Sequence, residues 1–186
     1  MKLLALDGHD GSGKTTLAHS LSIAVGAVVV RPFGGAAGRA LIAAYRSGSE
    51  ARVLAIGREA LIAAMMEHRD AERVVLDRGW LTVATLVPQA VFEARWGLWF
   101  PTVLLWCDER VTAARLAARH TDEPVVGSHA AFLQTYRDRF ALRPGTILRT
   151  DLEDRTSCLR ALVGAFETAT PFDIDSRPAM PLSAAP

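Results

Sequence analysis

The residues best suited to chemistry form a glycine-rich segment near the N-terminus. Its members are Gly8, Gly11, Ser12, Gly13, Lys14, Thr15 and Thr16. Glycines at this spacing let backbone amides turn inward around a phosphate, and a helix that begins at the lysine directs its positive end toward the same anion. In such a loop the lysine reaches the β and γ phosphates and the hydroxyl of Thr15 is suited to Mg²⁺. The spacing therefore predicts a site for ATP and magnesium, against the alternatives of a chance match and a loop that binds nucleotide without catalysis.

Three further charged residues are candidates for the same chemistry. Asp77 ends an apolar run, which is where a carboxylate holds magnesium directly or through water. The guanidinium of Arg78 is suited to bidentate contact with a phosphate, although an adjacent Asp and Arg can instead pair with other side chains. Asp10 and Asp77 are the candidate bases for an alcohol acceptor, whereas a monophosphate acceptor, already ionised, needs none.

The histidines offer no convincing base, which favours a phosphate acceptor. His9 lies inside the loop, and we expect its side chain to point to solvent rather than to carry protons. The other four show no metal-ligand spacing: His19, His68, His120 and His129.

The elements that must position these residues alternate between short apolar runs and helical patterns. Strands are expected at 3–6, 27–30, 74–76, 103–106 and 146–149. Helices are expected after the loop and at 39–46, 49–68, 82–99 with an interruption at Pro88, 109–119, 129–142 and 156–168. This order predicts an α/β fold with a five-stranded parallel sheet between two helical layers, in which ligands bind at the carboxyl ends of the strands. The segments 7–15, 31–35 and 77–80 all fall at such ends.

Composition limits the class of protein. The chain has 186 residues and a formal net charge of +1, so it is expected to form one domain over 1–170, and its charge does not favour a nucleic-acid partner. Cys107 and Cys158 show no disulfide or metal spacing, and no apolar run is long enough for a membrane span. We therefore expect a cytoplasmic protein, with 171–186 as a proline-containing tail.

Several motifs, in order, resemble the thymidylate kinase family of nucleoside monophosphate kinases over residues 2–166. They are the loop with its acidic residue Asp10, the Arg31 to Gly38 segment, the Leu54 to Arg58 segment, the Asp77 to Gly79 segment and the strand before Asp108. The resemblance implies a P-loop kinase fold, ATP at the loop, an acceptor monophosphate near Arg31 and Arg78, and Arg58 facing a nucleobase. It also implies a short lid at about 119–128, with Arg115 and Arg119 supplying guanidiniums, and a possible homodimer.

The chain departs from the family at the base-binding positions. Gly79, Leu54 and Leu86 stand where the family has aromatic residues. Phe33 and Trp80 are candidates to replace them, or else are ordinary core residues. The expected acceptor is a deoxypyrimidine or modified pyrimidine monophosphate. Alternatives are the hydroxyl of a modified nucleoside, a DNA base or another small molecule, and, from another class, a switch-type or non-catalytic nucleotide-binding module.

Overall fold

The structure, a computed structural model, describes residues 1–118 and 129–174. Within them the strands are β1 (Lys2–Asp7), β2 (Val28–Val30), β3 (Arg73–Asp77), β4 (Thr102–Trp106) and β5 (Ile147–Arg149). The helices are α1 (Lys14–Val25), α2 (Gly35–Arg46), α3 (Glu50–Glu67), α4 (Trp80–Ala84), α5 (Gln89–Arg95), α6 (Glu109–Ala117), α7 (His129–Phe140) and α8 (Arg155–Thr168).

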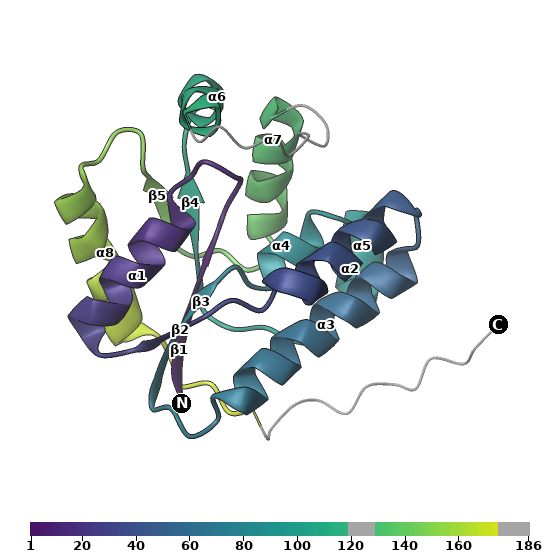
Figure 1. The fold of residues 1–186 in the computed structure, drawn as a ribbon, viewed down its shortest axis with the longest axis horizontal. Coiled ribbons are helices and arrows are strands. Elements are labelled where there is room, and N and C mark those ends of the chain that lie inside the picture. Colours follow the sequence, from purple (N-terminus) through teal and green to yellow (C-terminus); the bar gives the residue numbers. More distant parts are fainter. Residues whose placement is uncertain (119–128, 175–186) are drawn as a thin grey trace.

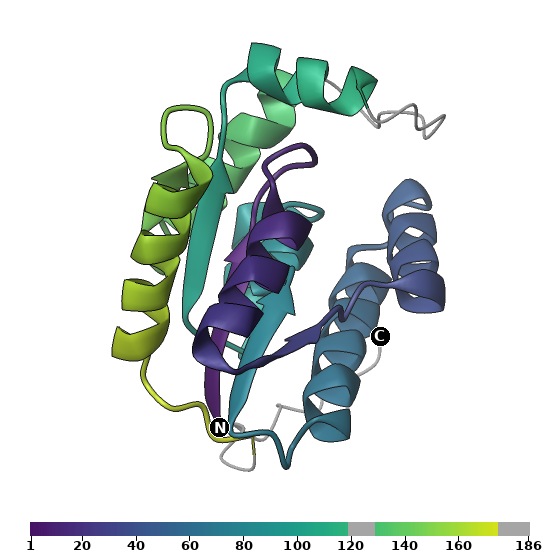
Figure 2. The same cartoon turned by 60° about the vertical axis from the view of Figure 1, so that its left-hand side comes forward.

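The strands form one parallel sheet in the order β2-β3-β1-β4-β5 (Figure 1). Figure 2 shows α1 and α8 on one side of the sheet and α2 and α3 on the other, while α6 lies beyond the carboxyl ends of the strands. The predicted three-layer α/β/α fold with five parallel strands is therefore confirmed. β1 is central, so the loop that follows it lies in the middle of the carboxyl edge, between the segments after β3 and β4.

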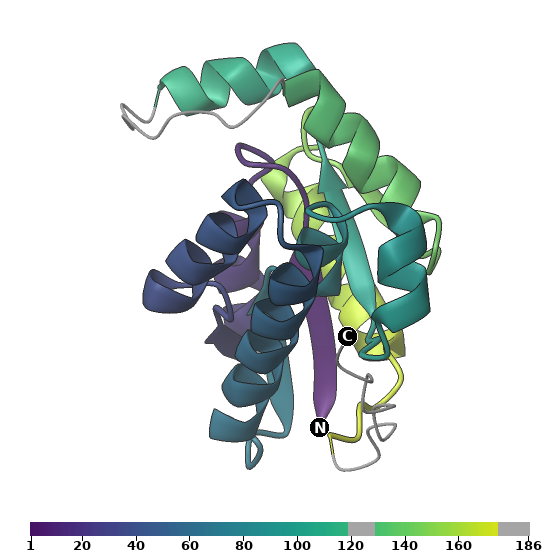
Figure 3. The same ribbon diagram turned by 90° about the vertical axis from the view of Figure 1, so that its right-hand side faces the viewer.

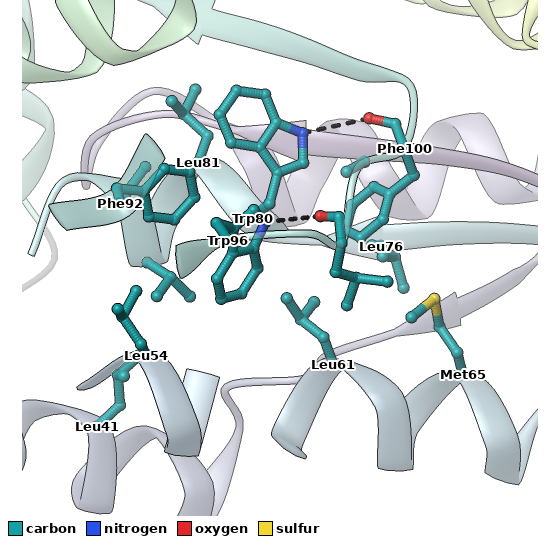
Figure 4. Close-up of a cluster of buried hydrophobic side chains, with 14 of the residues drawn as sticks. Leu41, Leu54, Leu61, Met65, Leu76, Trp80, Leu81, Phe92, Trp96 and Phe100 are labelled. Carbon is teal, nitrogen blue, oxygen red and sulfur yellow. Dashed lines mark hydrogen bonds between the residues drawn. The ribbon is translucent and has the colours of Figure 1, made fainter. Parts of the chain in front are cut away.

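Alternation along β1 divides the core in two. Leu4 and Leu6 pack with α1 and α8, whereas Leu3 and Ala5 belong to the larger cluster under α2 to α5 and α7. The larger cluster is rich in aromatic rings. Figure 4 shows Trp80 within it, its indole N–H donating to the carbonyl oxygen of Phe100 at 3.2 Å.

Several element boundaries differ from those expected. The helix expected at 39–46 begins at Gly35, because Gly38 can lie against the carbonyl oxygen of Phe33, which a Cβ would approach to 2.3 Å. The helical stretch expected at 82–99 is two short helices, and Pro88 stands immediately before α5, as a residue without an amide proton can. Asp154, whose carboxylate accepts from the amides of Thr156 and Ser157, starts α8.

The segment after α8 returns to the amino end of the sheet. Pro171 forms an antiparallel bridge with Lys2, and the amide of Phe172 donates to the carbonyl of Met1 at 2.9 Å. Figure 3 shows the N-terminus at the end of β1 opposite α6 and α7, so these contacts are remote from the loop. The first residues of the expected tail thus pack on β1, while 175–186 lie outside the described residues. No helix in the described ranges is long and apolar enough to cross a membrane.

Candidate functional site

The loop between β1 and α1 has the backbone that a phosphate cradle requires. Gly8, Gly11 and Gly13 have φ values of 147°, 83° and 88°, which side-chain-bearing residues rarely adopt. A Cβ on Gly8 would lie 2.1 Å from the carbonyl oxygen of Leu105 in β4, so this position admits only glycine. The sequence therefore combines a left-handed loop with a close approach to the neighbouring strand.

Lys14 is buried at the start of α1, and its Nζ donates to the carbonyl oxygen of His9 at 2.7 Å. Burial, helped by repulsion from Arg78, lowers the pKa of this amine to about 7. The side chain is thus curled into the loop, where its charge is costly, and an anionic phosphate would favour the protonated form.

Thr15 and Asp77 meet across the base of the loop. The Thr15 hydroxyl donates to Oδ2 of Asp77 at 2.7 Å, and Nε of Arg31 lies 3.2 Å from the same oxygen. The other oxygen, Oδ1, is buried and has no hydrogen-bond partner among the described residues. Because a buried oxygen of this kind is normally satisfied, the hydroxyl and the orphaned carboxylate oxygen fit a magnesium ion that also binds phosphates.

Arg78 is the one non-glycine residue in the described ranges with a positive φ, 83°. Its amide donates to the carbonyl oxygen of Leu6, and its guanidinium binds the carboxylate of Asp10. Partial desolvation raises the pKa of Asp10, but the charges of Arg78 and Lys14 outweigh it and hold that pKa at about 2. Asp10 is therefore a carboxylate between two cations, one on the donor side of the loop and one after β3.

Asp7, the last residue of β1, is completely buried. It accepts from the amide of Gly79 at 2.9 Å and from the hydroxyl of Thr82 at 2.6 Å. Burial raises the pKa of this carboxyl group above its usual value, although both hydrogen bonds oppose the shift. Its contacts join β1 to the turn after β3 and leave it enclosed, out of reach of an acceptor.

Arg115 reaches the loop from α6. Nη1 donates to the carbonyl of Gly11 and to the hydroxyl of Thr150, both at 3.1 Å, and Nη2 donates to the carbonyl of Thr150 at 2.6 Å. Beside it is an open cavity of about 310 Å³. The cavity is lined by Gly11, Gly13, Thr16, Leu17, Arg115, Thr150, Glu153, Arg155 and Cys158.

The cavity is the part of the site that sequence reasoning missed. Its far wall comes from Thr150 and the connection from β5 to α8, which carries no recognisable motif. The local sequence signal for this wall is Asp154, the N-cap residue that fixes where α8 begins. The cavity adjoins the loop and has the size of a small-molecule site.

The expectation for His9 is wrong. The residue is 9% exposed, its Nε2 lies 2.8 Å from Nδ1 of His129, and its ring stacks on Phe132 with ring centroids 5.8 Å apart. The rings that cover it come from α7, about 120 residues away in sequence, so the local pattern held no sign of them.

The residues expected to face the acceptor are not all brought together. Arg31 and Arg78 lie at the loop, and Phe33, half-buried, follows β2. Trp80 is completely buried in the core, which contradicts a base-stacking role. Arg58 donates to the carbonyl of Arg95 and lies over the ring of Trp96, against α5. Arg119 and the lid expected at 119–128 lie outside the described residues.

Comparison with known proteins supports the fold. No family model matches the sequence, and no curated protein does. Among solved structures, deoxyadenosine kinase from M. mycoides is similar with a TM-score of 0.62 and 14% identity, over 89% of this chain and 99% of that one. Thymidylate kinase from Candida albicans has a TM-score of 0.62 and 15% identity, over 90% and 91%. The YorR protein from Bacillus subtilis, in complex with phosphorylated GDP, has a TM-score of 0.57 and 16% identity, over 89% and 95%.

These likenesses define the class of fold. The chain has the P-loop fold of the deoxyadenosine kinase and the thymidylate kinase, over about nine tenths of its length. At such low identity the likeness extends to the fold, and the chemistry must be argued from the residues of this chain.

Proposed function

We propose that the protein transfers the γ-phosphoryl group of ATP to a nucleoside monophosphate. The loop from Gly8 to Thr16 holds the triphosphate, and the cavity beside Arg115 receives the donor base. Thr15 and Asp77 hold the magnesium ion, which supplies charge neutralisation on the phosphates. The ammonium group of Lys14 has three N–H donors, so it binds the phosphates while it keeps its bond to the carbonyl of His9. Arg31 and Arg78 bind the acceptor phosphate.

The proposal of a phosphate acceptor rests on the contacts of the three carboxylates at the loop. Asp7 is enclosed, Asp10 is bound to Arg78 with its pKa at about 2, and Asp77 is bonded to Thr15 beside Arg31. A hydroxyl acceptor calls for a base with a pKa nearer to neutrality, whereas an ionised monophosphate calls for cations. Two guanidiniums, and the lack of an available base among the residues that the structure describes, favour the monophosphate.

Because Trp80 is a core residue, the acceptor base needs another aromatic side chain to stack on. Leu54 is buried in the core and Gly79 has no side chain, so Phe33 is the remaining aromatic candidate of those that the sequence offers. Within the proposal, Phe33 stacks on a deoxypyrimidine or modified pyrimidine base, since a ring face binds any flat base of that size.

The test is a transfer assay with labelled ATP and magnesium. The acceptors are dTMP, dCMP, dUMP and 5-substituted dUMP, the matching nucleosides and a single-stranded oligonucleotide. We expect transfer to monophosphates alone, with kcat/KM lowered about hundredfold or more by Arg78→Met and by Lys14→Ala. Arg110→Ala, at an exposed site on α6, is the matched control.

Three results would refute the proposal. Faster transfer to nucleosides than to monophosphates assigns a hydroxyl acceptor, as in a nucleoside kinase. Rapid hydrolysis of ATP that no acceptor accelerates assigns a switch-type module. Tight ATP binding with no transfer or hydrolysis assigns a non-catalytic one.

A further inference from the structure

His9 lies inside the phosphate loop, but its contact with α7 has no part in the proposed chemistry. His9 is the residue between Gly8 and Asp10, and 9% of its surface is exposed. The rings that enclose it, His129, Phe132 and Tyr136, are spaced by three and four residues along α7. They therefore form one face of the helix, and that face rests on the loop.

The backbone of His9 governs the position of Lys14. Its carbonyl oxygen accepts the Nζ of Lys14 at 2.7 Å and the amide of Ser12 at 3.2 Å. Any shift of this peptide therefore moves the acceptor that holds the lysine and alters the turn of the cradle. The residue's side chain is fixed from outside the loop, by the imidazole of His129 at 2.8 Å.

The surroundings keep the imidazole of His9 neutral. Burial lowers the pKa of His9 to about 4; the carboxylate of Asp10 opposes the shift, and the charges of Lys14 and Arg78 add to it. Nε2 of His9 and Nδ1 of His129 then share one hydrogen bond, whose donor depends on the tautomers of the two rings. Such a bond is directional, in contrast to the stacking of His9 on Phe132.

We propose that His9 is a positioning residue: its hydrogen bond with His129 fixes the peptide that holds Lys14, and so couples the docking of α7 to binding of the donor phosphates. The proposal rests on the proposed function only in that the loop binds the donor. The side chain of His9 touches neither phosphate nor acceptor, and it acts through Lys14.

The experiment measures binding of magnesium tripolyphosphate, which has neither a base nor an acceptor, by calorimetry at pH 7.5. His9→Phe keeps a ring against Phe132 and removes the hydrogen bond, while His129→Ala removes the partner. We expect each to raise Kd by about five- to tenfold, the usual worth of one hydrogen bond, and the double variant to raise it no further. His129→Asn, which keeps a donor and an acceptor near Nδ1, is expected to restore most of the affinity.

A second readout follows Lys14 directly. The pH dependence of its acylation, measured by mass spectrometry, is expected to shift in His9→Phe and in His129→Ala and to be unchanged in His19→Ala, an exposed site on α1. The proposal would be overturned if, in both variants, Kd for tripolyphosphate stayed within twofold of the wild-type value and the pH dependence of Lys14 acylation did not shift. So would additive effects in the double variant, which assign independent packing roles. Failure of the wild type to bind tripolyphosphate or ATP would refute the donor site itself, and wild-type binding without transfer would refute only the proposed activity.

Discussion

Replacing Gly79 by alanine is expected to destabilise the fold, and the reason lies in how closely the turn after β3 packs. A Cβ at this position would lie 2.8 Å from Cβ of Ala5, 2.8 Å from Cε2 of Phe100 and 3.0 Å from Oδ2 of Asp7. Ala5 belongs to the central strand and the ring of Phe100 is held edge-on by Phe172, so neither neighbour moves freely.

The magnitude follows from these contacts. Overpacking of this kind costs about 1–3 kcal/mol, and weakening the bond from the Gly79 amide to Asp7 adds about 1 kcal/mol. The expected net loss is about 2–4 kcal/mol, equivalent to a Tm lowered by roughly 4–16 °C.

The assay is urea unfolding followed by tryptophan fluorescence. Gly164→Ala in α8 is the matched control, because a Cβ there meets nothing within 4 Å, and it should stabilise by up to about 1 kcal/mol. If Gly79→Ala changes the free energy of unfolding by less than about 0.5 kcal/mol, the surroundings yield easily and the packing argument is wrong.

Three further predictions concern the loop. Because the pKa of Lys14 is about 7 in the ligand-free protein, the amine must take up a proton on binding above that pH, so calorimetry should show Kd for tripolyphosphate rising about tenfold per pH unit between about pH 7.5 and 9; a flat profile contradicts this. Asp10→Asn should move the pH midpoint of Lys14 acylation to lower pH, because the carboxylate raises that pKa, and an unmoved midpoint would show that the two charges are not coupled. Arg115→Ala should raise KM for ATP about tenfold with little change in KM for the acceptor. Arg115→Lys should not restore the lower KM, since one ammonium group cannot replace a guanidinium that bridges Gly11 and Thr150. An equal rise in KM for both substrates would place Arg115 elsewhere in the mechanism.

The sequence was sufficient to predict the sheet and the glycine-rich loop after β1 because both depend on neighbouring residues. Apolar runs and the residues that end them placed all five strands to within a residue or two. The loop needs glycines in left-handed conformations immediately before a lysine, and that requirement is written in consecutive positions. Local patterns of this kind survive when the rest of the chain is unfamiliar.

The remainder of the site depends on contacts between distant segments. His9 forms a hydrogen bond with His129, which is 120 positions away in the sequence. Arg115 in α6 is held by a hydrogen bond to Thr150, which follows β5. Trp80 shows the same limit, because an aromatic residue after a strand has the same local pattern whether it stacks on a ligand or fills the core. It is core here because all five residues of α4 are buried.

The three carboxylates at the loop show why residue type and position do not assign a role. Asp7, Asp10 and Asp77 all follow or end strands at the same edge of the sheet. The sequence offered Asp10 and Asp77 as candidate bases, and Asp77 also as a magnesium ligand. Their partners separate them: Asp7 is enclosed by an amide and a hydroxyl, Asp10 is bound by a guanidinium, and Asp77 alone keeps a buried oxygen without a hydrogen bond among the described residues. An unsatisfied buried oxygen beside a threonine hydroxyl is a requirement that only a bound cation or donor can meet. Asp77 is therefore the carboxylate of the three best suited to a metal ion, and Asp10, with its pKa already low, is the one least able to accept a proton.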